Sequence, residues 1–432
     1  MSPPLPRSVH RTLRALVGDE HVITDPARLL VYDSDGLTAY RRPPRAVVLP
    51  GATEELVGVV RALHDAGIPV VPRGAGTGLS GGALPDSDAV VVGTARMDRI
   101  LDVDPENRLA RVQPGVVNSV LGRALAPHGL CYAPDPSSQS ACTLGGNVAE
   151  NSGGPHCLKY GVTSRYVSGL TLVLAGGALV EVGGAASDPA AGLDLVGAFV
   201  GSEGCFGIAA EIELRLMPLP GGARTLLGIF DGVEDAARAV TAIVAEGLLP
   251  AALEIMDGAS IQAVEASVYA AGYPTDAGAA LVVEFDGTEA GLDEDADRAE
   301  ACCREAGARA VERAEDEAQR TRLWQGRKKA FGAMGRIAPD LLVQDATVPR
   351  TRLPQVLREI MEIGDRYGLR VGNVFHAGDG NLHPKILFDR RDPDELERVE
   401  RASREMMEVC VAAGGTITGE HGVGLDKLKY MT

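Results

Sequence analysis

The chain has 432 residues, of which 45% are hydrophobic and 23% charged, a composition that fits a globular protein of two or three domains. Its formal net charge of −17 argues against nucleic acids and anionic membrane surfaces as partners, because both are bound through basic patches. No stretch approaches the about 18 consecutive apolar residues of a membrane span, and the first residues lack the apolar segment of a secretory signal. We therefore expect a cytoplasmic protein.

The first half of the chain predicts short strands with few helices. A strand at 45–50, a helix capped by Thr53 and a strand at 68–72 form an expected βαβ unit. One further helix is expected near 116–128. The remaining strands of this region are expected at 89–97, 110–115, 170–182 and 208–220, before a proline–glycine break at 218–222.

After the break the composition changes, and helices dominate. Helices are expected at 233–247, 296–310 and 393–413, and strands at 226–232, 280–287, 370–374 and 384–388. The fold class that we expect is α+β, with an antiparallel sheet and covering helices at about 220–370. None of the seven cysteines forms a C-x-x-C pair, so we expect no iron–sulfur cluster in this chain.

Glycine is unusually frequent, with 53 residues gathered in short clusters. The first cluster, PRGAGTGLSGGA at 72–83, contains a literal G-x-G-x-x-G from Gly76 to Gly81. An apolar strand and not a helix follows it, which argues against a dinucleotide-binding βαβ motif, and the absence of G-x-x-x-x-G-K excludes a P-loop. A nest of backbone N–H groups around a pyrophosphate fits better, with help from Arg73, Thr77 and Ser80.

Two more clusters support a large ligand. Residues 134–154 are small and polar, and we expect a loop that cannot pack a core of its own and lies along a flat aromatic cofactor. The segment GSEGCFGI at 201–208 precedes the last strand of this region. Backbone rich in glycine can approach a ligand closely, so the three clusters together indicate a cofactor site.

Histidines point to a second site. His376 and His383 stand at the two ends of a glycine-rich loop between two expected strands, and another glycine-rich segment carries Glu420 and His421. Gly378, Gly380 and Pro384 exclude a helix, so the loop can fold back and bring both imidazoles together. Two imidazoles and one carboxylate form a usual catalytic metal set, and the alternative is a hydrogen-bonded polar network beside the cofactor.

In the order and spacing of these clusters the chain resembles the vanillyl-alcohol oxidase and p-cresol methylhydroxylase superfamily of FAD enzymes. Within it, the chain resembles glycolate oxidase catalytic subunits and D-lactate and D-2-hydroxyglutarate dehydrogenases. The resemblance implies a two-subdomain FAD-binding domain at 1–219 and a cap domain at 220–432 that carries the metal loops. No attachment histidine lies between Arg73 and Leu84, so we expect non-covalent FAD.

The resemblance also implies which residues contact FAD, and they come from all three clusters. They are Arg73, Gly74, Ala75, Gly76, Thr77, Gly78, Ser80, Gly81, Pro134, Asp135, Thr143, Gly145, Gly146, Asn151, Gly153, Gly154, Tyr160, Gly161, Glu203, Gly204, Gly207 and Ile208. The metal, zinc or manganese, would be held by His376, His383 and Glu420, with His421 as the base. Of the cations Arg322, Arg327, Lys328, Lys329 and Arg336, the resemblance selects Arg327 to bind a substrate carboxylate.

The expected reaction is oxidation of glycolate or D-lactate to the 2-keto acid, with hydride transfer to flavin. A lysine of some D-2-hydroxyglutarate enzymes matches Val343 here, which favours a small monocarboxylate. Electrons would pass to an iron–sulfur partner subunit, a quinone or a cytochrome, and those partners could bring the protein to a membrane surface. Two alternatives are an oxidase that uses O₂ on another alcohol and a non-catalytic FAD-binding subunit.

Overall fold

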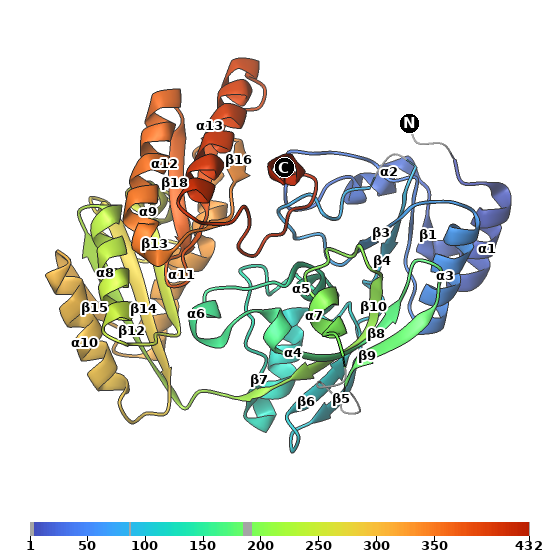
Figure 1. The fold of residues 1–432 in the computed structure, drawn as a ribbon, viewed down its shortest axis with the longest axis horizontal. Helices are drawn as coiled ribbons and strands as arrows, with labels where there is room; N and C mark the ends of the chain where they lie inside the picture. Colours follow the sequence, from blue (N-terminus) through green and yellow to red (C-terminus); the bar gives the residue numbers. More distant parts are fainter. Residues whose placement is uncertain (1–3, 86–87, 185–191, 432) are drawn as a thin grey trace. The chain divides into compact units, whose positions relative to one another are not determined.

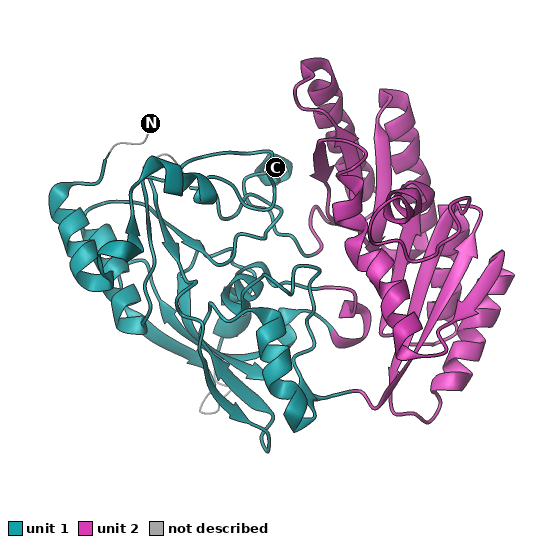
Figure 2. Cartoon of the chain, turned by 180° about the vertical axis from the view of Figure 1, so that it is seen from behind, with its two compact units in different colours: residues 1–153, 161–219, 420–432 teal, residues 154–160, 220–419 magenta. Residues whose placement is uncertain are grey.

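The computed structural model describes residues 4–85, 88–184 and 192–431. The chain divides into two compact units, shown in different colours in Figure 2. Unit 1 comprises Met1–Gly153, Gly161–Leu219 and Glu420–Thr432, and unit 2 comprises Gly154–Tyr160 and Pro220–Gly419. Among the described residues, no helix combines the length and the hydropathy that a membrane crossing needs.

Unit 1 contains a small sheet in the order β1-β2-β4-β3, formed by Val22–Ile23, Ala46–Val48, Val90–Gly93 and Val70–Arg73 (Figure 1). Strands β2, β4 and β3 are parallel, and helix α3 (Thr53–Asp65) connects β2 to β3, which confirms the predicted βαβ unit. Helices α1 (Arg7–Val17) and α3 bury their apolar residues against one face of this sheet, and α2 (Pro26–Leu29) lies on the other. The expected cap was wrong by one position, because Ala52 is the N-cap and Thr53 begins the helix.

A second sheet of unit 1 is antiparallel throughout, in the order β5-β6-β10-β8-β9. Its strands are Ile100–Asp104, Leu109–Val112, Ile208–Arg215, Val167–Val173 and Leu179–Gly183. The helices beside it are α4 (Asn118–Leu125), α5 (Leu144–Glu150) and α7 (Leu195–Phe199), and a short ribbon pairs β7 (Leu130–Cys131) with β11 (Met217–Pro218).

Helix α5 corrects one expectation. Residues 134–154 are not a loop throughout, because Leu144–Glu150 is helical, and Leu144 and Val148 are buried in the core under the second sheet. Leu144 and Val148 are four residues apart, so they lie on the same side of this short helix and give it one apolar face. The predicted lack of a core for this segment was therefore wrong.

Unit 2 is built on a nine-stranded sheet. Seven of the strands follow the order β15-β12-β14-β13-β18-β19-β17. The other two branch from β18, because β20 pairs with β18 and β16 pairs with β20. The strands expected at 226–232, 280–287, 370–374 and 384–388 are confirmed, with adjusted ends. The strands are β12 (Gly222–Phe230), β13 (Ala252–Asp257), β14 (Ala279–Gly287), β15 (Ala310–Arg313), β16 (Asp340–Val343), β17 (Ala346–Thr347), β18 (Arg370–His376), β19 (Asn381–Leu382) and β20 (Pro384–Phe388).

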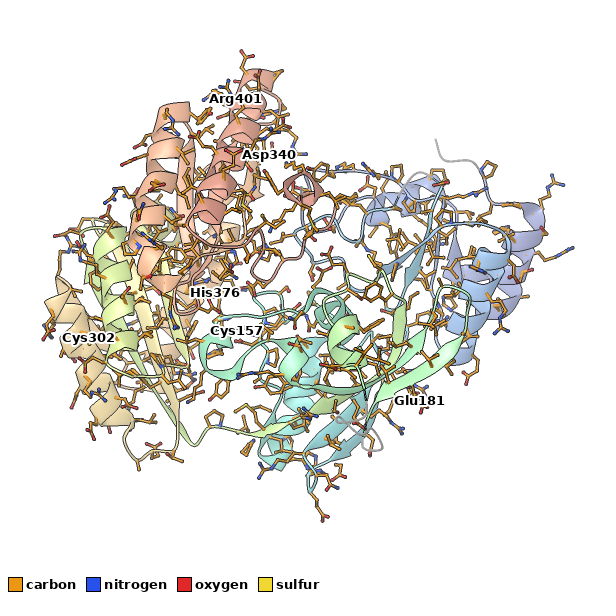
Figure 3. The ribbon with its side chains drawn as sticks, viewed as in Figure 1. Cys157, Glu181, Cys302, Asp340, His376 and Arg401 are labelled. Atoms are coloured by element: carbon orange, nitrogen blue, oxygen red, sulfur yellow. The ribbon has the colours of Figure 1, made fainter. Side chains whose placement is uncertain are left out.

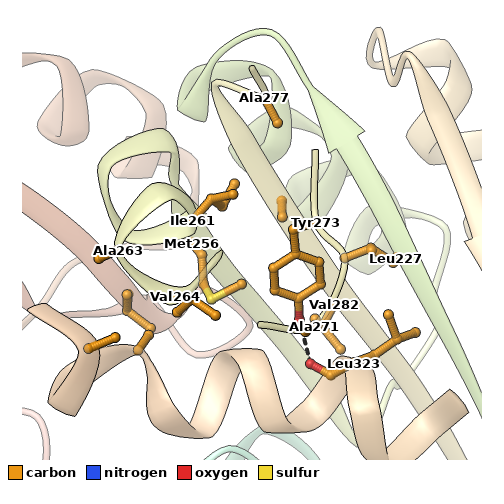
Figure 4. Packing of buried hydrophobic residues seen from close by; sticks show 14 of the residues in the cluster. Leu227, Met256, Ile261, Ala263, Val264, Ala271, Tyr273, Ala277, Val282 and Leu323 are labelled. Carbon is orange, nitrogen blue, oxygen red and sulfur yellow. Dashed lines mark hydrogen bonds between the residues drawn. The ribbon is translucent and has the colours of Figure 1, made fainter. Parts of the chain in front are cut away.

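The helices of unit 2 are α6 (Cys157–Tyr160), α8 (Val233–Ala245), α9 (Gly258–Glu265), α10 (Leu292–Glu305), α11 (Glu317–Met334), α12 (Leu353–Tyr367) and α13 (Pro393–Ala412). Between α9, α11 and the sheet, an apolar core gathers around Tyr273, whose hydroxyl donates to the carbonyl of Leu323 (Figure 4). A Cβ on Gly326 would lie only 2.5 Å from the Tyr273 ring, so glycine lets α11 approach this core closely. The next residue of α11 is Arg327.

Candidate functional site

His376 and His383 converge in unit 2. Strand β18 ends at His376, the chain turns, and β20 begins directly after His383 (Figure 3 labels His376). Gly380 takes φ +76° in this turn, where a Cβ would lie 2.2 Å from the carbonyl oxygen of Val348, so the turn requires glycine. The two imidazole centroids are 5.2 Å apart, and one nitrogen of each ring lies within 4.8 Å of the other. The predicted convergence is confirmed.

Glu254 holds His376 in one orientation. The two residues are paired directly across β13 and β18, and Glu254 Oε1 lies 2.7 Å from His376 Nδ1. Glu254 is fully buried, and burial of a carboxylate costs free energy unless partners such as His376 compensate for the lost water. A proton on Nδ1 donated to this carboxylate leaves Nε2 with its lone pair, and this carboxylate–imidazole pairing is typical of metal-binding histidines.

Arg327 pairs with the other oxygen of Glu254. Its side chain is only 7% exposed, and its Nε has no hydrogen-bond partner among the residues that the structure describes. A buried guanidinium with an unused donor favours an anionic ligand, since an unmatched buried donor costs free energy. Glu254 thus joins the predicted carboxylate-binding arginine to a predicted metal ligand, although nothing in its strand pattern indicated either role.

Asp345 is a second buried carboxylate that the sequence did not indicate. Its Oδ1 lies 3.6 Å from His383 Nδ1, and its Oδ2 accepts hydrogen bonds from Thr418 Oγ1 at 2.6 Å and from the Gly419 N–H at 2.9 Å. Asp345 therefore fixes the segment that immediately precedes Glu420 in the chain. Asp345 lies in the largely hydrophobic segment LLVQDATV, in which nothing indicates its contact with His383 or Gly419.

Lys385 is a third such residue. It is almost completely buried, and its Nζ donates to the carbonyl oxygens of Val374 at 2.9 Å and His383 at 3.1 Å. Burial, with the nearby charge of Arg327, lowers the pKa of this amine to about 7. Lys385 links the backbone of β18 to that of His383, and its cross-strand partner in β16 is Val343.

In unit 1 the glycine loop leaves β3 at Arg73 and leads to β4, as the sequence predicted. Gly76 and Gly81 have φ of +70° and +78°, and a Cβ on Gly78 would meet nothing within 4 Å. Arg73 Nη1, Ser80 Oγ and Thr143 Oγ1 are buried and lack hydrogen-bond partners within the described chain. Open backbone beside unused buried donors fits a pyrophosphate, so these residues suit the group that the loop was expected to hold.

The three glycine clusters meet in unit 1. A Cβ on Gly74 would lie 2.5 Å from Thr143 Oγ1, and a Cβ on Gly82 would lie 3.2 Å from Glu150 Oε1 and 3.7 Å from Glu203 Oε2. Burial raises the pKa of Glu150 to about 8, and the charges of Glu203 and Asp35 add to that effect.

Two predicted cofactor residues, Gly154 and Tyr160, belong to unit 2, where the Tyr160 hydroxyl donates to Asp286 at 2.6 Å. Other predicted contacts lie in unit 1. Asn151 ends α5 in the left-handed region and accepts from the Ser164 N–H, and Pro134 accepts from the Asn118 amide. Glu420 and His421 also group with unit 1, where both side chains are mostly buried.

Family comparisons agree with these observations. Residues 44–183 match the model of an FAD binding domain, and residues 219–432 match that of FAD linked oxidases, C-terminal domain. Glycolate oxidase subunit GlcD of Escherichia coli K12 is 48% identical over 424 residues, which cover 98% of this chain and 85% of that protein. The chain belongs to the FAD-linked oxidases. The expected family and the expected FAD-dependent oxidoreductase activity are thereby confirmed.

Other relatives of this FAD-linked oxidase include GlcD of Bacillus subtilis, 40% identical over 98% of this chain and 90% of that one, and a D-lactate dehydrogenase of Anaerostipes hadrus, 34% identical over 97% and 88%. A solved structure of p-cresol methylhydroxylase with substrate bound matches with a TM-score of 0.83 at 17% identity, over 99% of this chain and 92% of that one. A 4-ethylphenol oxidase from Gulosibacter chungangensis gives 0.79 at 19% identity, over 98% and 91%. The structural matches confirm the expected fold class.

Proposed function

We propose that this FAD-linked oxidase converts a small D-2-hydroxy acid, glycolate or D-lactate, to the 2-keto acid. The observation that carries the proposal is the buried Glu254, which joins Arg327 to His376. One carboxylate thereby holds a guanidinium, which can bind an anion, close to the His376 imidazole. This pairing suits a substrate with a carboxylate and a neighbouring hydroxyl, and the names of the relatives point to such substrates.

In this proposal Arg327 binds the substrate carboxylate, and Glu254 prevents the guanidinium and the imidazole from rotating away. His421 removes the hydroxyl proton. The chemistry that bound FAD would supply is acceptance of a hydride from the substrate carbon. Residues 1–219 are assigned to flavin binding and residues 220–432 to the cap that carries substrate and metal residues. The predicted FAD contacts in the three glycine clusters are part of this assignment.

We also propose that His376, His383 and Glu420 hold a divalent ion, zinc or manganese. Support comes from the pairing of the two imidazoles and from Asp345, which anchors Gly419, the chain neighbour of Glu420. Such an ion, when bound, lowers the pKa of a coordinated hydroxyl. Asp345 and Glu254 would then be the carboxylate partners that orient the His383 and His376 rings.

The substrate is proposed to be a monocarboxylate because Val343 offers no cation, and Lys385 across from it already donates to two carbonyl oxygens. The electron acceptor is proposed to be a separate iron–sulfur subunit, quinone or cytochrome. Any contact with a membrane would come through that partner, and the proposed location is the cytoplasm.

A panel of D- and L-2-hydroxy acids, read by reduction of an electron-accepting dye, tests the proposal. We expect glycolate or D-lactate to reduce the dye, and L-lactate and D-2-hydroxyglutarate to react far less. A panel in which no 2-hydroxy acid reduces the bound flavin would contradict the proposal. Rapid reoxidation in air-saturated buffer without dye would instead indicate an O₂-using oxidase, and binding of FAD without any turnover would indicate a non-catalytic subunit.

A further inference from the structure

We propose that Glu203 is a positioning residue that anchors the C-terminal segment carrying His421, a role that rests on the proposed function of His421 as the base. Glu203 stands in the third glycine cluster, more than two hundred residues before that segment. Both residues belong to unit 1. The sequence had indicated Glu203 only as a contact of the cofactor.

The anchor consists of two hydrogen bonds from backbone to one carboxylate. Glu203 Oε1 accepts from the Val423 N–H at 2.7 Å, and Oε2 accepts from the Gly424 N–H at 2.7 Å. Bonds to a charged acceptor are roughly twice as strong as neutral ones, and two bonds to one planar group also fix its direction. Both oxygens are used on the backbone just after His421, so the carboxylate acts on this segment.

The segment also fits closely against its surroundings. Gly422 has φ +86°, and a Cβ there would lie 2.5 Å from Glu150 Oε2 and 3.0 Å from Glu203 Oε1. A Cβ on Gly424 would lie 2.2 Å from the carbonyl oxygen of Ser80. The chain after His421 therefore has glycine where the carboxylates and the flavin loop leave no room for a side chain.

Further bonds continue the contact to the next turn. The Asp426 N–H donates to the Ser80 carbonyl at 3.1 Å, and the Tyr40 hydroxyl donates to Asp426 Oδ1 at 3.0 Å. Ser80 belongs to the loop that is expected to hold the FAD pyrophosphate. The anchored segment thus lies directly on the flavin loop, which would keep the base in a constant relation to the flavin.

The backbone of Glu203 indicates that its side chain is needed. Its φ is +53°, a left-handed conformation that is energetically unfavourable for a residue other than glycine. Its N–H donates to the Ala149 carbonyl at 2.8 Å, which holds it in this conformation. Glycine would adopt this backbone conformation at a lower cost in free energy. The carboxylate of Glu203 compensates through its hydrogen bonds to Val423 and Gly424, which glycine cannot make.

This backbone allows a sharp test, because Glu203→Gly removes the carboxylate without straining the chain. Glu203→Asp keeps the charge but shortens its reach, and Glu213→Gln is the matched control. Glu213 is a half-buried carboxylate on β10 of the same unit. Its carboxylate accepts from Ser168 Oγ at 2.8 Å, and among the described residues it has no hydrogen bond to the C-terminal segment. All variants are made in the full chain with FAD bound.

The first measurement is amide hydrogen exchange at Val423 and Gly424. We expect exchange to rise at least about tenfold in Glu203→Gly, less in Glu203→Asp and not in the control, with the rest of unit 1 unchanged. The second is dye-coupled oxidation of D-lactate and glycolate. We expect kcat to fall by about 100-fold in Glu203→Gly, with KM within about threefold of the wild type, because the base and not the carboxylate receptor is displaced.

Unchanged exchange in Glu203→Gly would overturn the anchor. Raised exchange with an unchanged kcat would overturn the positioning role, since His421 would then not depend on it. If the wild-type protein itself oxidises no 2-hydroxy acid, the proposed function fails, and the exchange measurement still shows whether Glu203 holds the segment.

Discussion

Glu254 and His376 face each other across β13 and β18, with 2.7 Å between Glu254 Oε1 and His376 Nδ1. We predict that Glu254→Gln weakens divalent metal binding by about 10- to 100-fold, because an amide cannot accept the imidazole proton as strongly as a carboxylate. The affinity is measured by titration calorimetry with zinc or manganese. The same substitution removes the ion pair with Arg327, so KM for the hydroxy acid should also rise.

Glu284→Gln is the matched control for this experiment. Glu284 is equally buried on the neighbouring strand β14 and binds Arg320 and the Trp324 indole, but it contacts neither histidine of the candidate metal site. It should lower the melting temperature and leave the metal affinity unchanged. Equal losses of metal affinity in both variants would mean that general destabilisation, and not the bond to His376, explains the effect.

Gly78→Asp should abolish FAD binding. A Cβ at this position meets no protein atom within 4 Å, so the variant should fold, and the added carboxylate would repel a pyrophosphate. Gly122→Asp is the control, because it introduces the same side chain into similarly open space on α4 of unit 1. Absorbance near the flavin bands of the purified variants gives the comparison, and a flavin-loaded Gly78→Asp would show that the loop has another role.

The flavin should be released intact by acid or heat. The described part of the 73–84 loop presents no histidine for covalent attachment. After precipitation, FAD should appear in the supernatant with its unmodified spectrum. Flavin that stays with the denatured polypeptide would contradict this expectation.

Removal of the metal should stop turnover and leave FAD bound, because the flavin and metal residues lie on different loops. His376→Ala, His383→Ala and Glu420→Ala should behave like the chelated protein, and only the wild type should recover when the ion is restored. His421→Ala should keep both metal and FAD but lose turnover. Full activity after exhaustive chelation, with no metal found by elemental analysis, would mean that the three residues bind no ion and form only a hydrogen-bonded network.

The free energy of unfolding should decrease as the pH rises from 4.5 to about 8, because of Glu150. Burial raises the pKa of this carboxyl from its ordinary 4.5 to about 8, so between these values the folded protein holds a proton that the unfolded chain has lost. Protonated Glu150 contributes fully to the free energy of unfolding below pH 4.5, and this contribution is lost as the pH rises to about 8. The loss is up to about 1.4 kcal/mol for each pH unit. Glu150→Gln, always neutral, should gain in melting temperature over the wild type as the pH is raised across this range. Parallel curves for the two proteins would contradict the assignment.

Local patterns in the sequence were enough for much of the fold. The period of apolar residues predicted the βαβ unit and the strands around the histidine loop, and glycine spacing predicted a loop that leads into a strand. These features depend on neighbours a few residues apart. The helix at Leu144–Glu150 escaped prediction because its stability comes from burial of Leu144 and Val148 in the core under the second sheet, and a short polar sequence does not reveal that core.

The sequence by itself also determined which residue types the candidate sites contain, since the histidines, Arg327 and the glycine loops stand in recognisable local contexts. Only the tertiary structure decided how they are held. Glu254 looks like an ordinary strand residue, and its role depends on the register of β13 against β18, which pairs residues 122 positions apart. Glu203 and Val423 are 220 positions apart. Such contacts form when distant segments pack together, so no spacing along the chain encodes them in a readable form.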